Sequence, residues 1–88
     1  MTQKKIIKKA NYMIVVGTFK YKKNAQKHLQ LIKKKYPITT QDKEAYVQIL
    51  RSNGKQLFES RFKYFSKQDA NQACKRLKKY KRDCFIRG

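Results

Sequence analysis

The sequence contains few residues of the kinds that carry catalysis or bind metals. It has one histidine, His28, and five acidic residues, which are Asp42, Glu44, Glu59, Asp69 and Asp83. None of these acids pairs with another at a spacing typical of a metal site or an acid–base pair. The two cysteines lack C-x-x-C spacing, and one histidine cannot complete a zinc site with them. We therefore predict that the chain is not an enzyme and that it uses no metal or cofactor.

Long hydrophobic runs are also missing. No stretch approaches the ~20 apolar residues of a membrane-spanning helix, so no transmembrane segment is predicted. The segment Lys4–Asn11, KKIIKKAN, is basic but has no apolar stretch of about 7 residues or more, as a signal peptide requires. Both a cytosolic protein and a piece of a longer exported protein are consistent with these features.

Negative charge is scarce, and positive charge is abundant. Lysine and arginine total 24 against 5 acidic residues, giving a formal net charge of +19 in 88 residues. Such a field attracts polyanions, including nucleic acid, acidic lipid and anionic cell-wall polymers. A lysine-rich, AT-biased genome is a second explanation for the charge. The length predicts one domain with a small core, at residues 12–88, preceded by a basic linker or arm at residues 1–11.

The first half of the chain predicts a strand followed by a helix. Tyr12–Phe19 is rich in β-branched residues, which favours a strand. Asn24 is a suitable cap for a helix that ends before Pro37. The apolar residues of this helix recur at helical spacing and are Ala25, Leu29 and Ile32. Thr39–Lys43 is expected to be a polar connection.

The second half predicts a hairpin, a helix and a short strand. Asn53-Gly54 is typical of a type I′ turn, which would join strands at Glu44–Arg51 and Lys55–Phe62. Ser66 is suited to cap the second helix. The apolar stripe of that helix is Ala70, Ala73, Cys74 and Leu77. Cys84–Arg87 is expected to be the last strand.

The element order βαββαβ predicts an α+β fold of the ferredoxin-like, or RNP-like, kind: a four-stranded antiparallel sheet with both helices on one face. Alternation along the strands divides their side chains between two faces. The set assigned to the core is Ile14, Val16, Val47, Ile49, Phe58, Phe62 and Ile86. The set assigned to the exposed face is Met13, Val15, Tyr46, Gln48, Leu57, Glu59, Arg61 and Phe85. The exposed face mixes aromatic and hydrogen-bonding groups and suits a ligand platform, although a solvated face or a dimer surface would show the same pattern.

Two motifs recur in the two halves of the chain. The first is a hydrophobic strand followed by Gly-Ser/Thr-Phe and an Asn-Ala that opens a helix, matched by Gly17, Thr18, Phe19, Asn24 and Ala25. The second is Gly-x-Phe followed by a polar stretch and a helical alanine, matched by Phe62, Phe65, Ser66 and Ala70. The glycine of the second motif is absent, and Lys63-Tyr64 stand in its place. Together these motifs resemble those of the SPOR domain, a bacterial peptidoglycan-binding module, and the resemblance covers Tyr12 to Arg87.

The resemblance implies a binding function at the exposed sheet face. SPOR domains bind glycan strands stripped of stem peptides, which are enriched at the dividing septum. The resemblance and the face assignment together nominate as glycan-binding residues Val15, Thr18, Tyr46, Gln48, Glu59 and Arg61. Val15 occupies a position where the family often has a ligand-binding glutamine. Sugar rings stack on aromatic groups, and the lactyl carboxylate freed by peptide removal would favour a cationic face.

The resemblance also implies a location and a covalent link. It places the domain in the periplasm or cell envelope, within a larger exported protein such as a cell-wall amidase or a D-alanyl-D-alanine carboxypeptidase. Disulfides persist in such oxidising compartments, so a Cys74–Cys84 bond is expected. Two reduced core cysteines that act as small hydrophobic residues are the alternative.

RNA binding is the main alternative function. The RRM fold has the same element order and binds RNA on its open sheet face, and the charge would suit nucleic acid as a nonspecific polyanion. However, the third strand of an RRM carries stacking aromatic residues, whereas this strand has Glu59 and Arg61 at those positions. A protein–protein interaction module is a further alternative.

Overall fold

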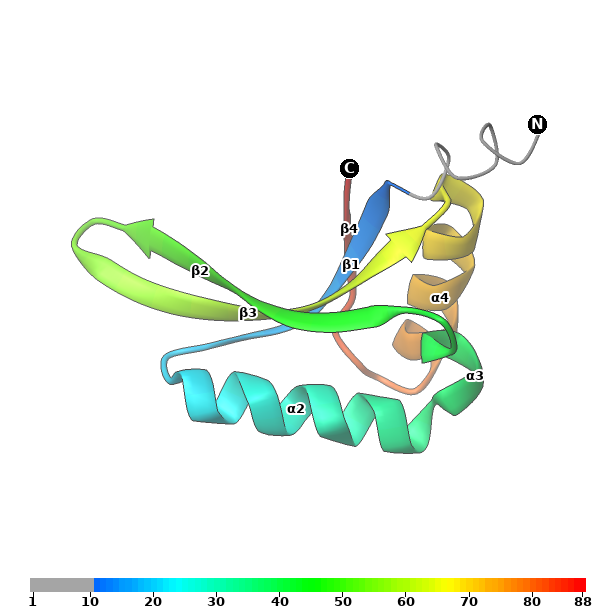
Figure 1. Cartoon of the computed structure of the whole chain (residues 1–88), viewed down its shortest axis with the longest axis horizontal. Helices are drawn as coiled ribbons and strands as arrows, with labels where there is room; N and C mark the ends of the chain where they lie inside the picture. The colour runs from blue at the N-terminus through cyan, green and yellow to red at the C-terminus, as the bar shows by residue number, and fades with distance from the viewer. Residues whose placement is uncertain (1–10) are drawn as a thin grey trace.

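The computed structural model describes residues 11–88, and the basic arm predicted at residues 1–11 lies outside the described residues except for Asn11. Figure 1 shows the arrangement of the elements. In chain order they are β1 (Tyr12–Phe19), α2 (Lys22–Lys35), α3 (Pro37–Thr40), β2 (Glu44–Ser52), β3 (Lys55–Phe65), α4 (Lys67–Lys79) and β4 (Phe85–Arg87).

Within residues 11–88 the strands form one four-stranded antiparallel sheet in the order β2-β3-β1-β4. This confirms the predicted α+β fold with βαββαβ order. The structure adds one short helix, α3, which overlaps the start of the polar connection expected at Thr39–Lys43. Pro37 stands in the first turn of α3, where its missing N–H costs nothing. Pro37 therefore ends α2 and also starts a further turn of helix.

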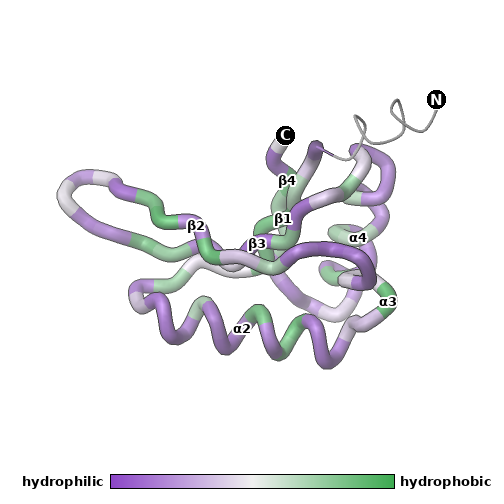
Figure 2. The backbone as a smooth tube through the Cα atoms, viewed as in Figure 1, coloured by the Kyte–Doolittle hydropathy of each residue, from purple (hydrophilic) through white to green (hydrophobic). Residues whose placement is uncertain are grey.

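The core lies between one face of the sheet and two helices. Ile14 and Phe62 from the sheet pack in a single cluster with Leu29 and Ile32 of α2 and with the buried residues of α4. Figure 2 shows hydrophobic segments alternating with hydrophilic ones along both helices, as expected for helices buried along one stripe. The opposite face of the sheet carries no helix in the described part of the chain. We call it the open face.

Two residues assigned to the core are more exposed than predicted. Ile49 is 42% exposed and Ile86 is 37% exposed, although both point toward the helix side. Figure 1 shows that the β2–β3 hairpin extends beyond the body of the domain, where no helix covers it. Ile86 lies in β4, an edge strand of three residues. Strand alternation gives the direction of a side chain, but burial also needs a covering element.

The helix starts differ in how well they were predicted. Ser66 caps α4 as expected, because its Oγ accepts a hydrogen bond from the backbone N–H of Asp69 at 3.0 Å. Asn24 does not cap α2, so that prediction is wrong. The cap position is Tyr21, whose side chain makes no capping bond, and Asn24 already lies in the first turn. The N–H of Asn24 bonds instead to the carbonyl of Tyr21 at 3.1 Å.

A β-bulge in β1 decides which face Thr18 occupies. Val15 pairs with Arg61, and Gly17 pairs with Ser60, which directly precedes Arg61 in the antiparallel strand β3. Val16 is therefore an extra residue without a partner in this ladder. A bulge of this kind shifts the alternation of the strand by one. Without it, Thr18 would point into the core. With it, Thr18 joins Val15 on the open face.

Gly17 leaves room for the side chains that follow the bulge. A Cβ atom on Gly17 would lie 2.8 Å from the ring of Phe19 and 3.1 Å from that of His28. These two rings pack with centroids 5.2 Å apart, and the Nε2 of His28 donates to the carbonyl of Val16 at 2.9 Å. His28 therefore has a structural partner in α2–β1 packing. The Gly-Thr-Phe motif both ends the strand and turns its threonine toward the open face.

Two further local predictions appear in the structure. Asn53 and Gly54 have φ values of 52° and 75°, and positive φ at both positions is what a type I′ turn requires. Cys74 in α4 and Cys84, just before β4, are bonded, with Cα atoms 5.1 Å apart. Both cysteines are buried.

Candidate functional site

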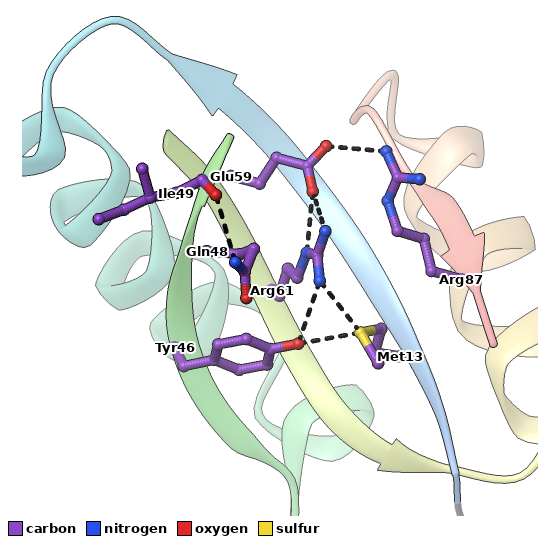
Figure 3. Close-up of polar contacts among 7 residues, drawn as sticks. All are labelled: Met13, Tyr46, Gln48, Ile49, Glu59, Arg61 and Arg87. Carbon is purple, nitrogen blue, oxygen red and sulfur yellow. Dashed lines mark hydrogen bonds and ion pairs between the residues drawn. The ribbon is translucent and has the colours of Figure 1, made fainter. Parts of the chain in front are cut away.

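The open face brings together side chains from all the strands of the described sheet. Cross-strand pairing arranges them in rows: Tyr46, Arg61, Val15 and Phe85 form one row, and Gln48, Glu59 and Thr18 form the next. Figure 3 shows the polar contacts at the centre of this face, among them those of Tyr46, Glu59 and Arg61. Side chains opposite each other on one face are direct neighbours. The candidate residues nominated from the sequence therefore do meet on one surface.

An ion network occupies the middle of the open face. The Glu59 carboxylate accepts hydrogen bonds from Arg61 through Nε at 2.8 Å and Nη2 at 2.6 Å, both to Oε1. Its second oxygen, Oε2, accepts from Nη2 of Arg87 at 2.9 Å. One carboxylate thus holds two guanidinium groups, which leaves the cluster with a net positive charge.

Tyr46 and Met13 extend the network along the same face. The Tyr46 hydroxyl donates to the Met13 sulfur at 2.9 Å. Nη1 of Arg61 lies 3.4 Å from the Tyr46 hydroxyl oxygen and 3.4 Å from the Met13 sulfur (Figure 3). These contacts fix the guanidinium plane and the tyrosine ring side by side.

The network shifts the pKa values of two of its members. Burial alone would raise the pKa of the Glu59 carboxyl, but hydrogen bonds and charges from Arg61 and Arg87 outweigh it, and the pKa is lowered. Burial alone would lower the pKa of Arg61, but hydrogen bonds to Tyr46 and Glu59 outweigh it, and the pKa is raised. The charges of Glu59 and Arg61 are therefore both retained at neutral pH.

Two of the nominated residues are less accessible than expected. Val15 lies on the open face but is fully buried, since its cross-strand partners Arg61 and Phe85 flank it. Glu59 is 3% exposed, and both of its oxygens are bonded to arginines. The prediction that these two side chains are exposed is wrong. Alternation along the strands gave the correct face. It did not reveal that the long side chains of neighbouring residues cover a short side chain or one held in an ion pair.

The other nominated residues are accessible. Thr18 and Gln48 are exposed, and Tyr46 and Arg61 are half-buried. Phe85, which ends the row opposite Tyr46, is 59% exposed. The row therefore has an aromatic ring at each end and a guanidinium between them. This arrangement can stack on the apolar face of a sugar and donate hydrogen bonds to its oxygens.

Two residues beside the row were not nominated from the sequence. The Nζ of Lys63 lies 5.3 Å from the centroid of the Tyr46 ring and 5.3 Å from that of the Tyr64 ring. Tyr64 is 48% exposed and has a φ of 80°. The departure from the Gly-x-Phe motif at Lys63-Tyr64 was the signal in the sequence that pointed to this place.

Most of the lysines in the described residues lie away from the open face. They run along α2 and α4, and several line a groove of about 860 Å³ between α2 and the start of β2. The groove lysines are Lys22, Lys23, Lys27, Lys33 and Lys43. A test of specific binding at the open face must therefore separate it from general attraction of polyanions by the helices.

Within residues 11–88, no group of three or more potential metal-ligating side chains comes together. None of the helices described is long and apolar enough to cross a membrane.

Comparison with known proteins identifies the family. A family model, the SPOR domain, matches residues 8–88. Among solved structures, the chain is similar to the solution structure of the peptidoglycan-binding domain of the B. subtilis cell wall lytic enzyme CwlC. The two are 22% identical with a TM-score of 0.58, and the match covers 89% of this chain and 87% of that one. This likeness shows a shared fold. A search of curated proteins finds no similar sequence. Since the family model spans nearly the whole chain, the protein belongs to the SPOR domain family.

Proposed function

We propose that this domain is a non-catalytic peptidoglycan-binding module whose open face receives glycan strands that have lost their stem peptides. Family membership supports peptidoglycan as the ligand, and the solved relative is itself a peptidoglycan-binding domain of a lytic enzyme. The observation that carries the choice of face is the row of Tyr46, Arg61 and Phe85 across the sheet. Thr18 and Gln48 in the adjacent row add exposed polar groups.

The charge of the open face supports a preference for stripped strands. The Arg61–Glu59–Arg87 cluster carries a net positive charge, and Arg87 has a half-exposed side chain. Removal of a stem peptide frees the lactyl carboxylate of muramic acid. Charge-assisted hydrogen bonds between a guanidinium and a carboxylate are about twice as strong as neutral ones. A peptide-bearing strand offers no free carboxylate at this position.

A role in cell division follows as part of this proposal. Binding to stripped strands would direct a parent protein to the septum. The parent would be a larger exported protein of the cell envelope, in the periplasm, such as an amidase or a carboxypeptidase. The catalytic activity would then reside in another domain of that parent.

The first test is binding to purified sacculi before and after amidase treatment. We expect binding to rise when stem peptides are removed, and to persist in ~0.3 M salt, where exposed charge attraction is strongly screened. A control for general attraction by the helices is the triple variant Lys75→Gln, Lys78→Gln, Lys79→Gln, which lowers the charge of α4, leaves the open face unchanged, and should keep the preference for stripped sacculi. Equal binding to intact and stripped sacculi that disappears in salt would reduce the protein to a nonspecific polycation.

The second test changes the open face itself. Tyr46→Ala or Gln48→Ala should weaken glycan binding by about 1–2 kcal/mol, the scale of one stacking or hydrogen-bonding contact. Both side chains point away from the helices, so the circular dichroism spectrum should stay that of the wild type. Isothermal titration with amidase-released glycan strands measures the effect. A folded double variant that binds as tightly as the wild type would place the ligand on another surface.

RNA binding is disfavoured by the same network. The two β3 positions where an RRM stacks bases hold Glu59 and Arg61, which bond to each other. Neither position can accept a base without breaking this ion pair. A single-stranded RNA oligonucleotide should therefore bind only at low salt and be unaffected by Tyr46→Ala.

A further inference from the structure

We propose that Tyr46, Lys63 and Tyr64 form a subsite for a carboxylate-bearing sugar at the end of β3, with Tyr64 held in a strained conformation that presents its ring. This inference rests on the proposed glycan-binding function and extends the binding surface beyond the row formed by Tyr46, Arg61, Val15 and Phe85. The three residues come from two adjacent strands, β2 and β3. The Nζ of Lys63 lies 5.3 Å from the centroid of each of the two tyrosine rings.

The backbone at Tyr64 is the first observation. Its φ of 80° lies in the left-handed region, which favours glycine and is unusual for a bulky side chain. The other non-glycine residues with positive φ in the described chain are Asp42, Asn53 and Lys81. Aspartate and asparagine tolerate this region through local hydrogen bonds, which a tyrosine side chain does not make. Lys81 lies in the turn that follows α4, where a left-handed residue is common. Strain of this kind persists where the surrounding structure imposes it, and it collects at functional sites.

The surroundings show what imposes the strain. Tyr12 pairs with Phe65 and Met13 with Lys63, so Tyr64 is the extra residue of a second bulge in the β1–β3 ladder. The Nζ of Lys43 donates to the Tyr64 carbonyl at 2.9 Å. The pairs on each side hold the backbone in place. The side chain itself contributes little to the core, because it is 48% exposed.

The chemistry of the cluster defines its ligand. Two tyrosine rings offer flat apolar surfaces, and the ammonium of Lys63 lies against both of them. The carboxylate of Glu44 is 3.6 Å from this ammonium, with both side chains well exposed to solvent. An exposed pair of this kind is weak and can be exchanged for a ligand carboxylate. A sugar that stacks on a ring and places a carboxylate on Lys63 matches these groups.

The test uses Tyr64→Gly, with Tyr64→Phe as the matched control that keeps the ring. Glycine removes the ring and relieves the strained φ, so the melting temperature should be unchanged or higher. Binding to amidase-released glycan strands should weaken roughly three- to tenfold, the range of one aromatic contact. Tyr64→Phe should bind like the wild type. If Tyr64→Gly does not fold, Tyr64→Asn replaces it, since asparagine also tolerates positive φ.

The role of Lys63 is tested with the same strands after their carboxylates have been converted to amides. Lys63→Gln should lose affinity for the native strands and bind the amidated strands as the wild type does. A folded Tyr64→Gly variant with wild-type affinity would overturn the subsite, as would a Lys63→Gln variant that still distinguishes the two ligands like the wild type. If the wild-type domain binds no glycan at all, the proposed function itself is wrong. If Tyr46→Ala weakens binding while Tyr64→Gly does not, only this inference is wrong.

Discussion

Glu59→Gln is expected to lower the free energy of unfolding by roughly 2–4 kcal/mol, a large share of the stability of a small domain. The substitution keeps the shape of the side chain and removes the charge that holds Arg61 and Arg87. The Arg61 side chain is only 11% exposed, so its charge would remain in a partly desolvated place without a counter-ion. The estimate lies below that for a fully buried ion pair because some solvent reaches the guanidinium. Urea denaturation followed by circular dichroism measures the change.

Two control variants separate the stability contributed by the buried Glu59–Arg61 pair from that contributed by the more exposed Glu59–Arg87 pair. Arg87→Gln removes a partner whose side chain is 49% exposed, and it should cost less than about 1 kcal/mol. The double variant Glu59→Gln, Arg61→Met removes both buried charges, and it should recover part of the loss caused by Glu59→Gln alone. A Glu59→Gln variant as stable as the wild type would show that the network adds nothing to folding.

The same carboxylate makes stability depend on pH in a predictable direction. The pKa of Glu59 is lowered in the folded state, so the folded protein binds this proton less readily than the unfolded chain. The contribution of ionised Glu59 to the free energy of unfolding is complete above the ordinary glutamate pKa, and it is lost as the pH falls through the lowered folded-state pKa. Acidification should therefore destabilise the wild type more than Glu59→Gln, which has no proton to bind at this position. Parallel pH profiles for the two proteins would contradict the assignment.

The fold was predictable because its signals are local. A β-branched run, an Asn-Gly turn and a serine before an apolar stripe each indicate one element, and their order restricts the topology to few choices. Asn24 shows where such a signal fails. Asparagine is a good cap, but the helix begins at Lys22, because the backbone of Tyr21 already accepts the first helical hydrogen bonds. Capping preference identifies candidate positions, and the backbone hydrogen bonds determine at which of them the helix begins.

The open face was predictable as a set of residues but not as a surface. Alternation placed Tyr46, Gln48 and Arg61 there correctly. It could not show that Val15 is covered or that Glu59 is held by two arginines, because those facts depend on side chains from strands far apart in the sequence. Nor could it locate the bulge at Val16, which is what turns Thr18 toward the face. Cross-strand contacts and bulges are tertiary properties, which a strand pattern alone does not contain.

Loss of the Cys74–Cys84 disulfide is expected to lower the free energy of unfolding by roughly 2–3 kcal/mol. The bond closes a loop with a sequence separation of 10, and its main effect is to restrict the unfolded chain. The variant Cys74→Ala, Cys84→Ala keeps small apolar groups at two buried positions and isolates the covalent link. Urea denaturation of the wild type with and without a reducing agent should show the same difference. The alanine variant should not respond to reduction, which makes it the control for the reductant.

The disulfide also has an expected effect on the open face, because it anchors the strand that follows it. β4 is an edge strand of three residues that pairs only with β1 in the described sheet. It carries Phe85, which ends the open-face row opposite Tyr46, and Arg87, which bonds to Glu59. Without the covalent link, β4 should open more often, so that its amide protons exchange faster and glycan binding weakens. Slow exchange and unchanged binding in a fully reduced protein would show that pairing with β1 is sufficient to hold β4. Mass spectrometry that finds two free thiols in periplasm-expressed protein would show that the bond does not form there.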